Sequence, residues 1–372
     1  MKILYSCLSK SWGGMEMYTL TSIDQLIKRG IKVELICVAE SRIHVEATNM
    51  GIILYPIKAS SYIHPFTTLR LAILIRNNNY SVVHTQASKD LWLLVPALFL
   101  AHSKIPLFLT KHVGSFIIKK DFFHKILYKR LTRIFAISTA IKNNLVETTP
   151  TNPEKITILP DGIDTKRFDL MIVDNMKVRK EFSINTEEIV VGMLARFTPG
   201  KGHEEFLWAA NELNKEYKNL RFLIVGEPSR GEYSYADRIK KLAKNYNLKN
   251  LIFTGYREDI PEVLSAMDIF AFPSHAEAFG IALVEAMAMR KPSVCSNAEG
   301  ILDIAIDCKT SLLFENRNAK DLKAKLKSLI DSQDIRFKLG ENARKRVLEN
   351  YDLAHITERV LQIYREEMQS PS

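Results

Sequence analysis

Residues 272–285 read FPSHAEAFGIALVE, a stretch that combines the end of an apolar strand, a turn and the start of a helix. We expect the helix to expose its first backbone N–H groups at Phe279 to Ile281, and such a helix start attracts anions. Glu277 precedes this helix and Glu285 lies about two turns inside it, so two carboxylates bracket a phosphate-sized site. Acids near a helix start also favour the helix dipole, so the pair alone leaves a structural role open.

The same alternation of strand and helix extends in both directions from this stretch. Strands are predicted in the second half at 189–194, 220–225, 250–253, 269–272 and 292–296, with helices at 203–217, 233–246, 261–266 and 279–289. In the first half, strands are predicted at 2–7, 32–38, 81–84, 106–110, 133–137 and 156–160, with helices at 15–29, 66–76, 91–101 and 121–131. Alternating strands and helices indicate parallel sheets covered on both faces.

The fold class is therefore α/β, with two Rossmann-like, doubly wound domains that we expect to face a central cleft. A length of 372 residues suits two domains. We place the domains at 1–165 and 166–350, and a polar stretch at 161–188 suits the linker between them. The tail from 319 to 368 is expected to be helical throughout, and residues 351–372 are expected to form a helix that packs back on the first domain.

The composition is that of an ordinary folded protein, with 47% hydrophobic and 25% charged residues. The longest apolar run, at 91–101, is too short to cross a membrane, and the first residues lack the pattern of a signal peptide. We therefore expect a cytoplasmic protein. The four cysteines are scattered, with no spacing typical of a metal site, and are interpreted as buried free thiols.

The net charge of +10 is concentrated in the first half of the chain. Residues 1–170 carry 22 Lys and Arg against 12 Asp and Glu, whereas the remaining residues carry equal numbers. Within the first half, Ser115 to Arg133 interleaves basic with large apolar residues, a pattern typical of a helix on an anionic membrane surface. A helix that faces the core with a solvated basic side gives the same pattern, so this alternative stays open.

A second motif, GMLARFTPGKG at 192–202, follows the first predicted strand of the second domain. Its loop carries Arg196 and Lys201. Two cations on a glycine-containing loop suit a diphosphate, because Arg binds as a fork and Lys as a point charge. A basic surface loop is the plain alternative.

In the first domain, Gly13 and Gly14 lie between the first strand and the first helix, where a ligand could approach the backbone closely. They do not form a GxGxxG motif, which disfavours a nicotinamide or flavin cofactor.

Taken together, these motifs resemble the retaining glycosyltransferases of family GT4, which have the GT-B fold, over nearly the whole chain. The specific elements are E-x7-E at Glu277 and Glu285, the Arg196, Lys201 and Gly202 loop, the Gly13 and Gly14 pair, and Thr110-Lys111-His112 after a first-domain strand. Asp161 departs from the family, which more often has Asn there, and Gly226-Glu227-Pro228 replaces a more glycine-rich segment.

The resemblance implies a role for each matching residue. Arg196 and Lys201 would hold the donor diphosphate, Glu285 the ribose hydroxyls and Glu277 the hydroxyls of the transferred sugar. The remaining donor contacts would come from the N–H groups of Phe279, Gly280 and Ile281, from Gly13 and Gly14, and from Tyr256, beside Arg257, at the nucleobase. His112 would face the sugar near the acceptor, with a satisfied structural histidine as its alternative. Arg196, Lys201, Glu277 and His112 are thus the predicted catalytic residues.

The resemblance also implies the reaction. Residues 1–165 would bind the acceptor and residues 166–350 the nucleotide sugar. We expect a hexose or N-acetylhexosamine to pass, with retention and without metal or cofactor, from a UDP-sugar, or from GDP-mannose, to a glycan or lipid-linked acceptor of the cell envelope, such as a polysaccharide or lipopolysaccharide. An epimerase or phosphorylase of the same fold is the alternative, and a basic nucleic-acid-binding protein is a distant one.

Overall fold

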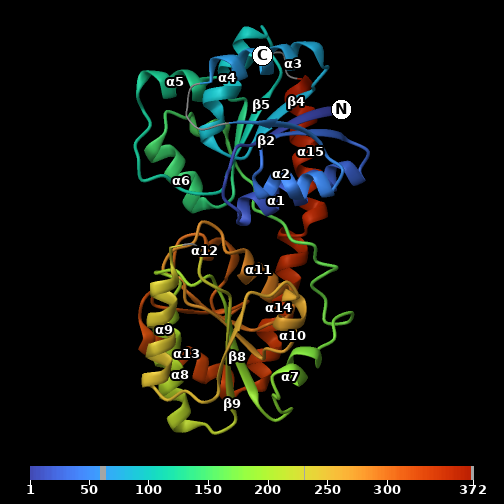
Figure 1. The fold of residues 1–372 in the computed structure, drawn as a ribbon. Coiled ribbons are helices and arrows are strands. Elements are labelled where there is room, and N and C mark those ends of the chain that lie inside the picture. Colours follow the sequence, from blue (N-terminus) through green and yellow to red (C-terminus); the bar gives the residue numbers. More distant parts are fainter. Residues whose placement is uncertain (59–63, 230, 370–372) are drawn as a thin grey trace. The chain divides into compact units, whose positions relative to one another are not determined.

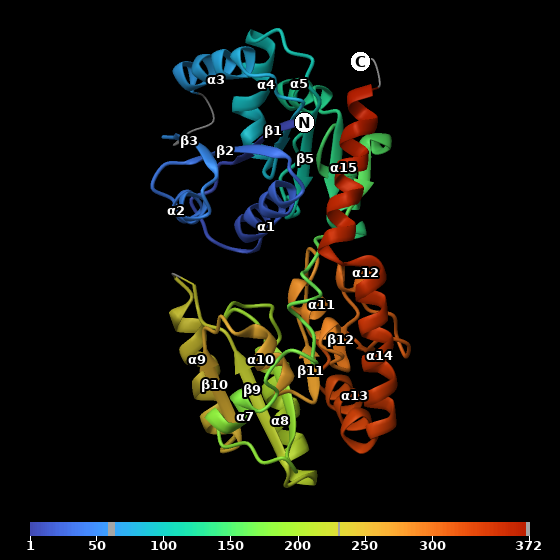
Figure 2. The same cartoon turned by 90° about the vertical axis from the view of Figure 1, so that its right-hand side faces the viewer.

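The computed structural model describes residues 1–58, 64–229 and 231–369, and these form two compact units (Figures 1 and 2). Unit 1 contains Met1–Asp161 together with the C-terminal helix from Ala354, and unit 2 contains Gly162–Leu353. The chain therefore passes between the units at Asp161 and again at Leu353, a few residues from the boundaries expected at 165 and 350. Each unit is built around one parallel sheet.

Unit 1 has a seven-stranded parallel sheet in the order β3-β2-β1-β4-β5-β6-β7. Its strands are β1 (Lys2–Cys7), β2 (Lys32–Val38), β3 (Ile53–Ile57), β4 (Val82–Thr85), β5 (Leu107–Lys111), β6 (Arg133–Ala136) and β7 (Ile156–Ile158). The interior strand β1 is buried almost throughout, as expected of a parallel strand covered on both faces.

The helices of unit 1 are α1 (Gly14–Lys28), α2 (Arg42–Asn49), α3 (Pro65–Asn77), α4 (Leu91–Leu100), α5 (Phe122–Lys129), α6 (Thr139–Thr148) and α15 (Leu353–Gln369). Helices α1, α2 and α15 pack on the side chains of Ile3, Tyr5 and Cys7. The buried Tyr364 of α15 bonds through its hydroxyl group to the hydroxyl group of Tyr5 at 3.4 Å and to Nδ1 of His84. The C-terminal helix is thus an integral part of the core of unit 1.

Unit 2 has a six-stranded parallel sheet in the order β10-β9-β8-β11-β12-β13. Its strands are β8 (Ile189–Leu194), β9 (Leu220–Val225), β10 (Leu251–Gly255), β11 (Ile269–Phe272), β12 (Ser293–Ser296) and β13 (Leu312–Phe314). Its helices are α7 (Lys177–Glu181), α8 (His203–Glu216), α9 (Tyr233–Asn245), α10 (Ile260–Ser265), α11 (Ile281–Ala288), α12 (Ile301–Ile304), α13 (Ala319–Asp331) and α14 (Gln333–Asn350). One apolar core joins helices α8, α9 and α13 to the sheet.

The two parallel sheets confirm the predicted α/β class, and several elements differ from the prediction. Strands β3 and β13 and helices α2, α6, α7 and α12 were not predicted. The tail predicted to be helical at 319–368 is interrupted at Ser332 and at Tyr351 and Asp352. The polar stretch 161–188 contains α7 and is partly buried. Cys308, which was expected to be buried, is exposed. The helix predicted at 121–131 is the shorter α5, and the residues before it, from 113 to 121, are not helical.

None of the helices within the described ranges is both long and apolar enough to cross a membrane.

Candidate active site

Two loops of unit 2 come together because their strands are neighbours. β8 pairs with β11, with Val191 opposite Ile269, so the loops that follow them leave the same edge of the sheet. Parallel α/β sheets bind their ligands at such an edge. The N–H of His275 donates to the carbonyl oxygen of Gly200 at 2.8 Å and joins the two loops directly.

At the junction, Lys201 of the β8–α8 loop forms an ion pair with Glu277 of the β11–α11 loop. Both side chains are mostly buried, with 24% of Lys201 and 16% of Glu277 exposed. The structure therefore brings together a cation and a carboxylate that were singled out from two separate motifs. A ligand that carries both phosphate and hydroxyl groups could take up both charges.

The β11–α11 loop is held in place from several directions. The Gly300 N–H donates to the carbonyl oxygen of Glu277 at 3.0 Å, and the Asn316 Nδ2 amide donates to the carbonyl oxygen of His275 at 2.8 Å. In addition, Nε2 of His275 lies 2.8 Å from Oε1 of Glu205 on α8. Glu277 is thus carried by a loop whose backbone is fixed independently of the ion pair.

The start of α11 differs from the prediction. Its first residue is Ile281, and Gly280 precedes it at φ +117°, in the left-handed region that favours glycine. Phe279 lies before the helix, and its buried ring packs on Tyr351 with centroids 5.8 Å apart. The N–H groups of Leu283 and Val284 already donate to the carbonyl oxygen of Gly280, which leaves those of Ile281 and Ala282 to serve an anion. Glu285 consequently lies little more than one turn from the helix start, not two.

Glu285 is half-buried, and no hydrogen bond or ion pair holds its carboxylate within the part of the chain that the structure describes. Burial raises the pKa of Glu285 from its ordinary value to about 7, and the nearby Arg167 guanidinium opposes part of this rise. A buried carboxylate without donors is costly unless a ligand supplies them. Glu285 is therefore a group prepared to accept hydrogen bonds from a bound molecule.

Arg196 extends from the same β8–α8 loop as Lys201. It is exposed and lies 3.4 Å from a carboxylate oxygen of Glu232, so it can turn toward a ligand at modest cost. Tyr256 is also exposed, at 54%. Arg257 next to it makes short ion pairs with Glu181 and Asp259, and these contacts raise the pKa of Arg257 and give it a structural role.

In unit 1, Gly13 caps α1 and Gly14 is its first residue. A Cβ on Gly14 would meet no atom within 4 Å, and one on Gly13 would make an ordinary contact with Glu16. Neither glycine is required by packing within the chain. Open space beside the first turn of a long helix is what a close ligand approach needs.

His112 follows β5 and is buried, with polar groups at both ring nitrogens. Its Nε2 lies 2.9 Å from Oε1 of Gln86, and its Nδ1 lies 3.4 Å from Oδ2 of Asp161. The Tyr18 ring packs on it edge-on at 5.8 Å. These partners fix the orientation of the imidazole ring. The role of His112 in the reaction stays a prediction.

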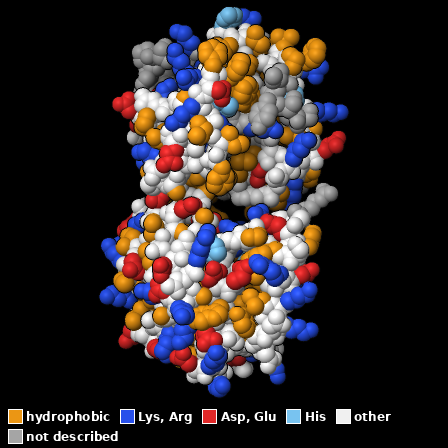
Figure 3. Space-filling model, turned by 90° about the vertical axis from the view of Figure 1, so that its left-hand side faces the viewer, with side chains coloured by type: hydrophobic (Ala, Val, Ile, Leu, Met, Phe, Trp, Pro, Cys, Tyr) orange, Lys and Arg blue, Asp and Glu red, His pale blue; other side chains and the backbone are white. Residues whose placement is uncertain are grey.

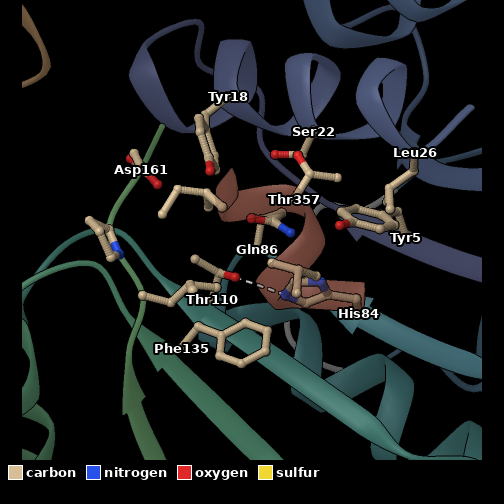
Figure 4. Close-up of a pocket in the computed structure, with 14 residues that line it drawn as sticks. Tyr5, Tyr18, Ser22, Leu26, His84, Gln86, Thr110, Phe135, Asp161 and Thr357 are labelled. Atoms are coloured by element: carbon tan, nitrogen blue, oxygen red, sulfur yellow. Dashed lines mark hydrogen bonds between the residues drawn. The ribbon is translucent and has the colours of Figure 1, made fainter. Parts of the chain in front are cut away.

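A small cavity lies beside the partners of His112 (Figure 4). Its volume is about 30 Å³, room for one or two water molecules, and Gln86, Thr110 and Asp161 are among its lining residues. Oδ1 of Asp161 is buried and has no hydrogen-bond partner among the residues described. The cavity therefore presents an unused acceptor at the carboxyl ends of β4, β5 and β7.

Among the predicted site residues, the structure groups Lys201 with Glu277, and Gly280, Ile281 and Glu285 at one helix start. Arg196 lies on the same β8–α8 loop as Lys201 but points to Glu232, and Tyr256 lies on another loop of unit 2. Gly13, Gly14 and His112 belong to unit 1. Sequence reasoning missed the supporting residues, which are Gln86, Asn316, Gly300 and Arg167. Arg167 lies six residues after Asp161, and nothing in the sequence indicated that its charge acts on Glu285.

No group of three or more His, Cys, Asp or Glu side chains within the described ranges is arranged to hold a metal ion.

Comparison with known families matches nearly the whole chain. Residues 12–167 match Glycosyltransferase Family 4, and residues 174–346 match Glycosyl transferases group 1. The first match contains Gly13, Gly14 and His112, and the second contains the unit 2 site residues from Arg196 to Glu285.

Two curated relatives are similar at moderate identity. The capsular polysaccharide biosynthesis glycosyltransferase CapM of Staphylococcus aureus is 26% identical over 63% of this chain and 61% of its own length. The N,N'-diacetylbacillosaminyl-diphospho-undecaprenol alpha-1,3-N-acetylgalactosaminyltransferase of Campylobacter jejuni is 28% identical over 85% of each chain.

Solved structures share the fold. A glycosyltransferase from Rickettsia africae has a TM-score of 0.90 at 25% identity, covering 100% of this chain and 99% of its own. The Anabaena protein HepE in complex with UDP has a TM-score of 0.86 at 20% identity, covering 98% of this chain and 100% of its own, a likeness that shows the fold alone.

Proposed function

This chain belongs to the group 1, family 4 glycosyltransferases of the GT-B fold, and we propose that it transfers a sugar from a nucleoside diphosphate sugar bound in unit 2. The observation that carries the proposal is the meeting of Lys201 with Glu277 at the carboxyl ends of β8 and β11, next to the start of α11. A cation and helix N–H groups can bind the diphosphate, and carboxylates can bind the hydroxyl groups of the sugar joined to it.

Each group has a distinct task in this proposal. Lys201 and Arg196 bind the diphosphate and stabilise the charge that develops there as the glycosidic bond breaks. Glu285, which lacks donors inside the chain, accepts hydrogen bonds from the ribose hydroxyls. Glu277 exchanges its contact with Lys201 for the hydroxyls of the transferred hexose or N-acetylhexosamine.

The reaction is proposed to retain the anomeric configuration. The bond from the anomeric carbon to the diphosphate breaks, and its electron pair leaves with the nucleoside diphosphate. The acceptor hydroxyl attacks from the same face, and its proton passes to the leaving phosphate oxygen. Arg196, Lys201 and the start of α11 supply the positive field at that oxygen, so we propose a reaction without metal or cofactor.

Unit 1 is proposed to bind the acceptor, with His112 near the acceptor hydroxyl. The names of two relatives support an envelope glycan or a lipid-linked sugar, since one acts in capsular polysaccharide synthesis and the other on a diphospho-undecaprenol substrate. We favour a UDP-sugar as donor, and GDP-mannose remains the second choice.

Titration calorimetry tests the donor proposal directly. Native protein in EDTA is titrated with UDP, GDP, UDP-glucose, UDP-N-acetylglucosamine and GDP-mannose, and one nucleotide series should bind. The variant Glu285→Ala should weaken that binding, whereas Glu349→Ala, at an exposed residue of α14, should leave it unchanged. Absence of binding by every nucleotide would refute the proposal.

A further inference from the structure

Three consecutive apolar side chains project from unit 1 directly before α5. Phe116, Ile117 and Ile118 are 107%, 70% and 71% exposed, and we call them the apolar tip. A phenylalanine exposed to this degree contacts almost nothing in its own chain. Large apolar side chains grouped in this way are rare on monomeric proteins and mark an interaction surface.

The apolar tip is carried by an anchored loop. On one side, the N–H of Ser115 donates to Oδ1 of Asn144 at 2.7 Å, and the Asn144 amide donates back to the carbonyl oxygen of Ser115 at 2.9 Å. On the other side, the N–H of Lys119 donates to the carbonyl oxygen of Thr148 at 2.6 Å. Both ends of the tip are thus tied to α6, so the backbone presents these side chains outward.

Further exposed apolar residues lie on the neighbouring helices. Phe122 and Phe123 open α5 and are 70% and 62% exposed. Helix α5 packs on α4 and α4 on α3, where Phe66 is 82% exposed. Figure 1 shows α5, α4 and α3 side by side, and Figure 3 shows hydrophobic side chains with Lys and Arg among them on this unit. Exposed apolar side chains therefore lie on α5 and α3 as well as at the apolar tip.

The segment that carries these residues has an excess of positive charge. Residues 64–133 contain 11 Lys and Arg against two acids, Asp90 and Asp121. Of the 11 cations, Arg133 is paired with Glu367, and the helix α6 that anchors the tip adds one exposed acid, Glu147. Asp90 is buried, and the Asp121 carboxylate accepts hydrogen bonds from the N–H groups of Phe123 and His124 as the cap of α5. The lysines nearest the tip, Lys119, Lys120, Lys125 and Lys129, form no ion pair within the described part of the chain. Their charge remains available to a partner.

We propose that the apolar tip and its lysines dock unit 1 on the surface of an anionic phospholipid bilayer. Lipid headgroups attract the lysines, and the boundary of the acyl chains takes up Phe116, Ile117 and Ile118. A nucleic acid would use the lysines and leave the aliphatic side chains in water. A protein groove could cover the tip, but it would not require so large an excess of positive charge.

In this proposal, Ser115 to Arg133 does not bind the membrane as the single helix that the sequence pattern suggested. The apolar part is a protruding loop with the first turn of α5, not one long helix lying flat. The docking surface is independent of the donor site, because all of its residues lie in unit 1 and none binds the nucleotide in the proposed function. Its test therefore needs no transferase activity.

Co-sedimentation with vesicles tests the proposal. Native protein should bind vesicles of phosphatidylcholine with 30% phosphatidylglycerol (roughly the anionic share of a strongly charged leaflet) and should bind pure phosphatidylcholine about tenfold more weakly. The triple variant F116S, I117S, I118S should lose about tenfold in affinity for the anionic vesicles, because its apolar anchor is gone. The variant K119E, K120E should lose at least as much.

The matched control is a similar set of exposed residues on α14 of unit 2. Ile335 and Phe337 are 41% and 71% exposed and are followed by the exposed Lys338. The variant I335S, F337S, K338E should bind vesicles like native protein. Equal binding by the tip variant and native protein, or no binding of native protein to anionic vesicles, would overturn the proposal. Self-association that the tip variant abolishes, without vesicle binding, would assign the face to a second copy and also overturn it.

Insertion can be measured separately. In the variant Phe116→Trp, brominated lipid should quench the added fluorescence, whereas Phe337→Trp should show no quenching beyond that of native protein. Equal quenching in both variants would contradict insertion of the tip.

Discussion

Gly202 lies so close to Pro273 that a Cβ on the glycine would stand 2.1 Å from the Pro273 carbonyl oxygen. This contact joins the loop that carries Lys201 to the loop that carries Glu277. Gly202 also has φ +76°, where a side chain is strained. The approach of the two backbones thus depends on the absence of one methyl group.

Replacing Gly202 with alanine should therefore destabilise unit 2 by about 2–4 kcal/mol, since backbone overlap adds to the strain of a left-handed residue. Denaturant unfolding measures the change. Gly200→Ala is the matched control, because Gly200 has φ +86° in the same loop and open space around its Cβ position. It should cost about 1 kcal/mol. Equal losses in the two variants would contradict a packing role for Gly202.

Lys201→Ala should lower kcat by about 10²–10³-fold, because the charge that develops on the diphosphate loses its partner. Steady-state kinetics with the donor found by calorimetry measures this effect. The exposed Lys249, also in unit 2, supplies the control variant Lys249→Ala, which should retain native kinetics. A Lys201→Ala enzyme with native kcat would remove Lys201 from the proposed mechanism.

Glu285→Gln should change how stability depends on pH. The pKa of Glu285 is raised in the fold to about 7, so its protonated form stabilises the native state below pH 4.5 and this contribution is lost as the pH rises through 7. Glutamine cannot ionise, so the variant does not lose this stability as the pH rises. The variant should gain about 1–3 kcal/mol over native protein between pH 4.5 and 8. Chemical unfolding at several pH values measures the difference, and a constant difference would show that Glu285 is not desolvated.

His112→Ala should lower kcat while leaving nucleotide affinity unchanged, since the residue lies in unit 1 and is assigned to the acceptor. Gln86→Leu should lower kcat less, because it removes one of the two groups that orient the imidazole. Kinetics and calorimetry on the same preparations separate the two effects. If His112→Ala transferred sugar at the native rate, His112 would be a structural histidine.

Arg344→Ala should destabilise unit 2 by about 3–5 kcal/mol, because it removes a buried cation and leaves its acceptors unpaired. Arg344 is buried on α14 and donates to the carbonyl oxygens of Thr165 and Ala288 at 3.1 and 2.9 Å. The exposed neighbour Lys345 gives the control Lys345→Ala, which should be near neutral. Equal stability of the two variants would show that the bond from Arg344 to Thr165 does not matter for stability, and that the residues after Asp161 act as a simple linker.

The elements that could be predicted from the sequence were those with a clear pattern of apolar residues. β1 and β2 were predicted to the residue because a buried parallel strand is a continuous apolar run. β3, ILYPI, contains a proline and lies at the sheet edge, and β13 has three residues, so neither gave a clear pattern.

The start of α11 was misplaced for a local reason. Phe279 suits a helix by composition, but its ring is drawn into the core against Tyr351, and Gly280 turns the chain before the helix begins. The motif residues themselves were found in the sequence because charged side chains on glycine-rich loops are conspicuous. The residues that support them, such as Gln86 and Asn316, are polar side chains whose contacts depend on tertiary folding.

Because α15 belongs to unit 1 but is synthesised last, the order of synthesis affects when unit 1 can fold. Unit 2 is one continuous segment, complete once Leu353 has been made, whereas unit 1 requires both ends of the sequence. Until Tyr364 has left the ribosome, the hydroxyl group of Tyr5 and Nδ1 of His84 lack the buried hydroxyl group that they contact in the native structure, and the core of unit 1 stays open. Domains usually fold in the order of their synthesis. Here the second unit can finish before the first.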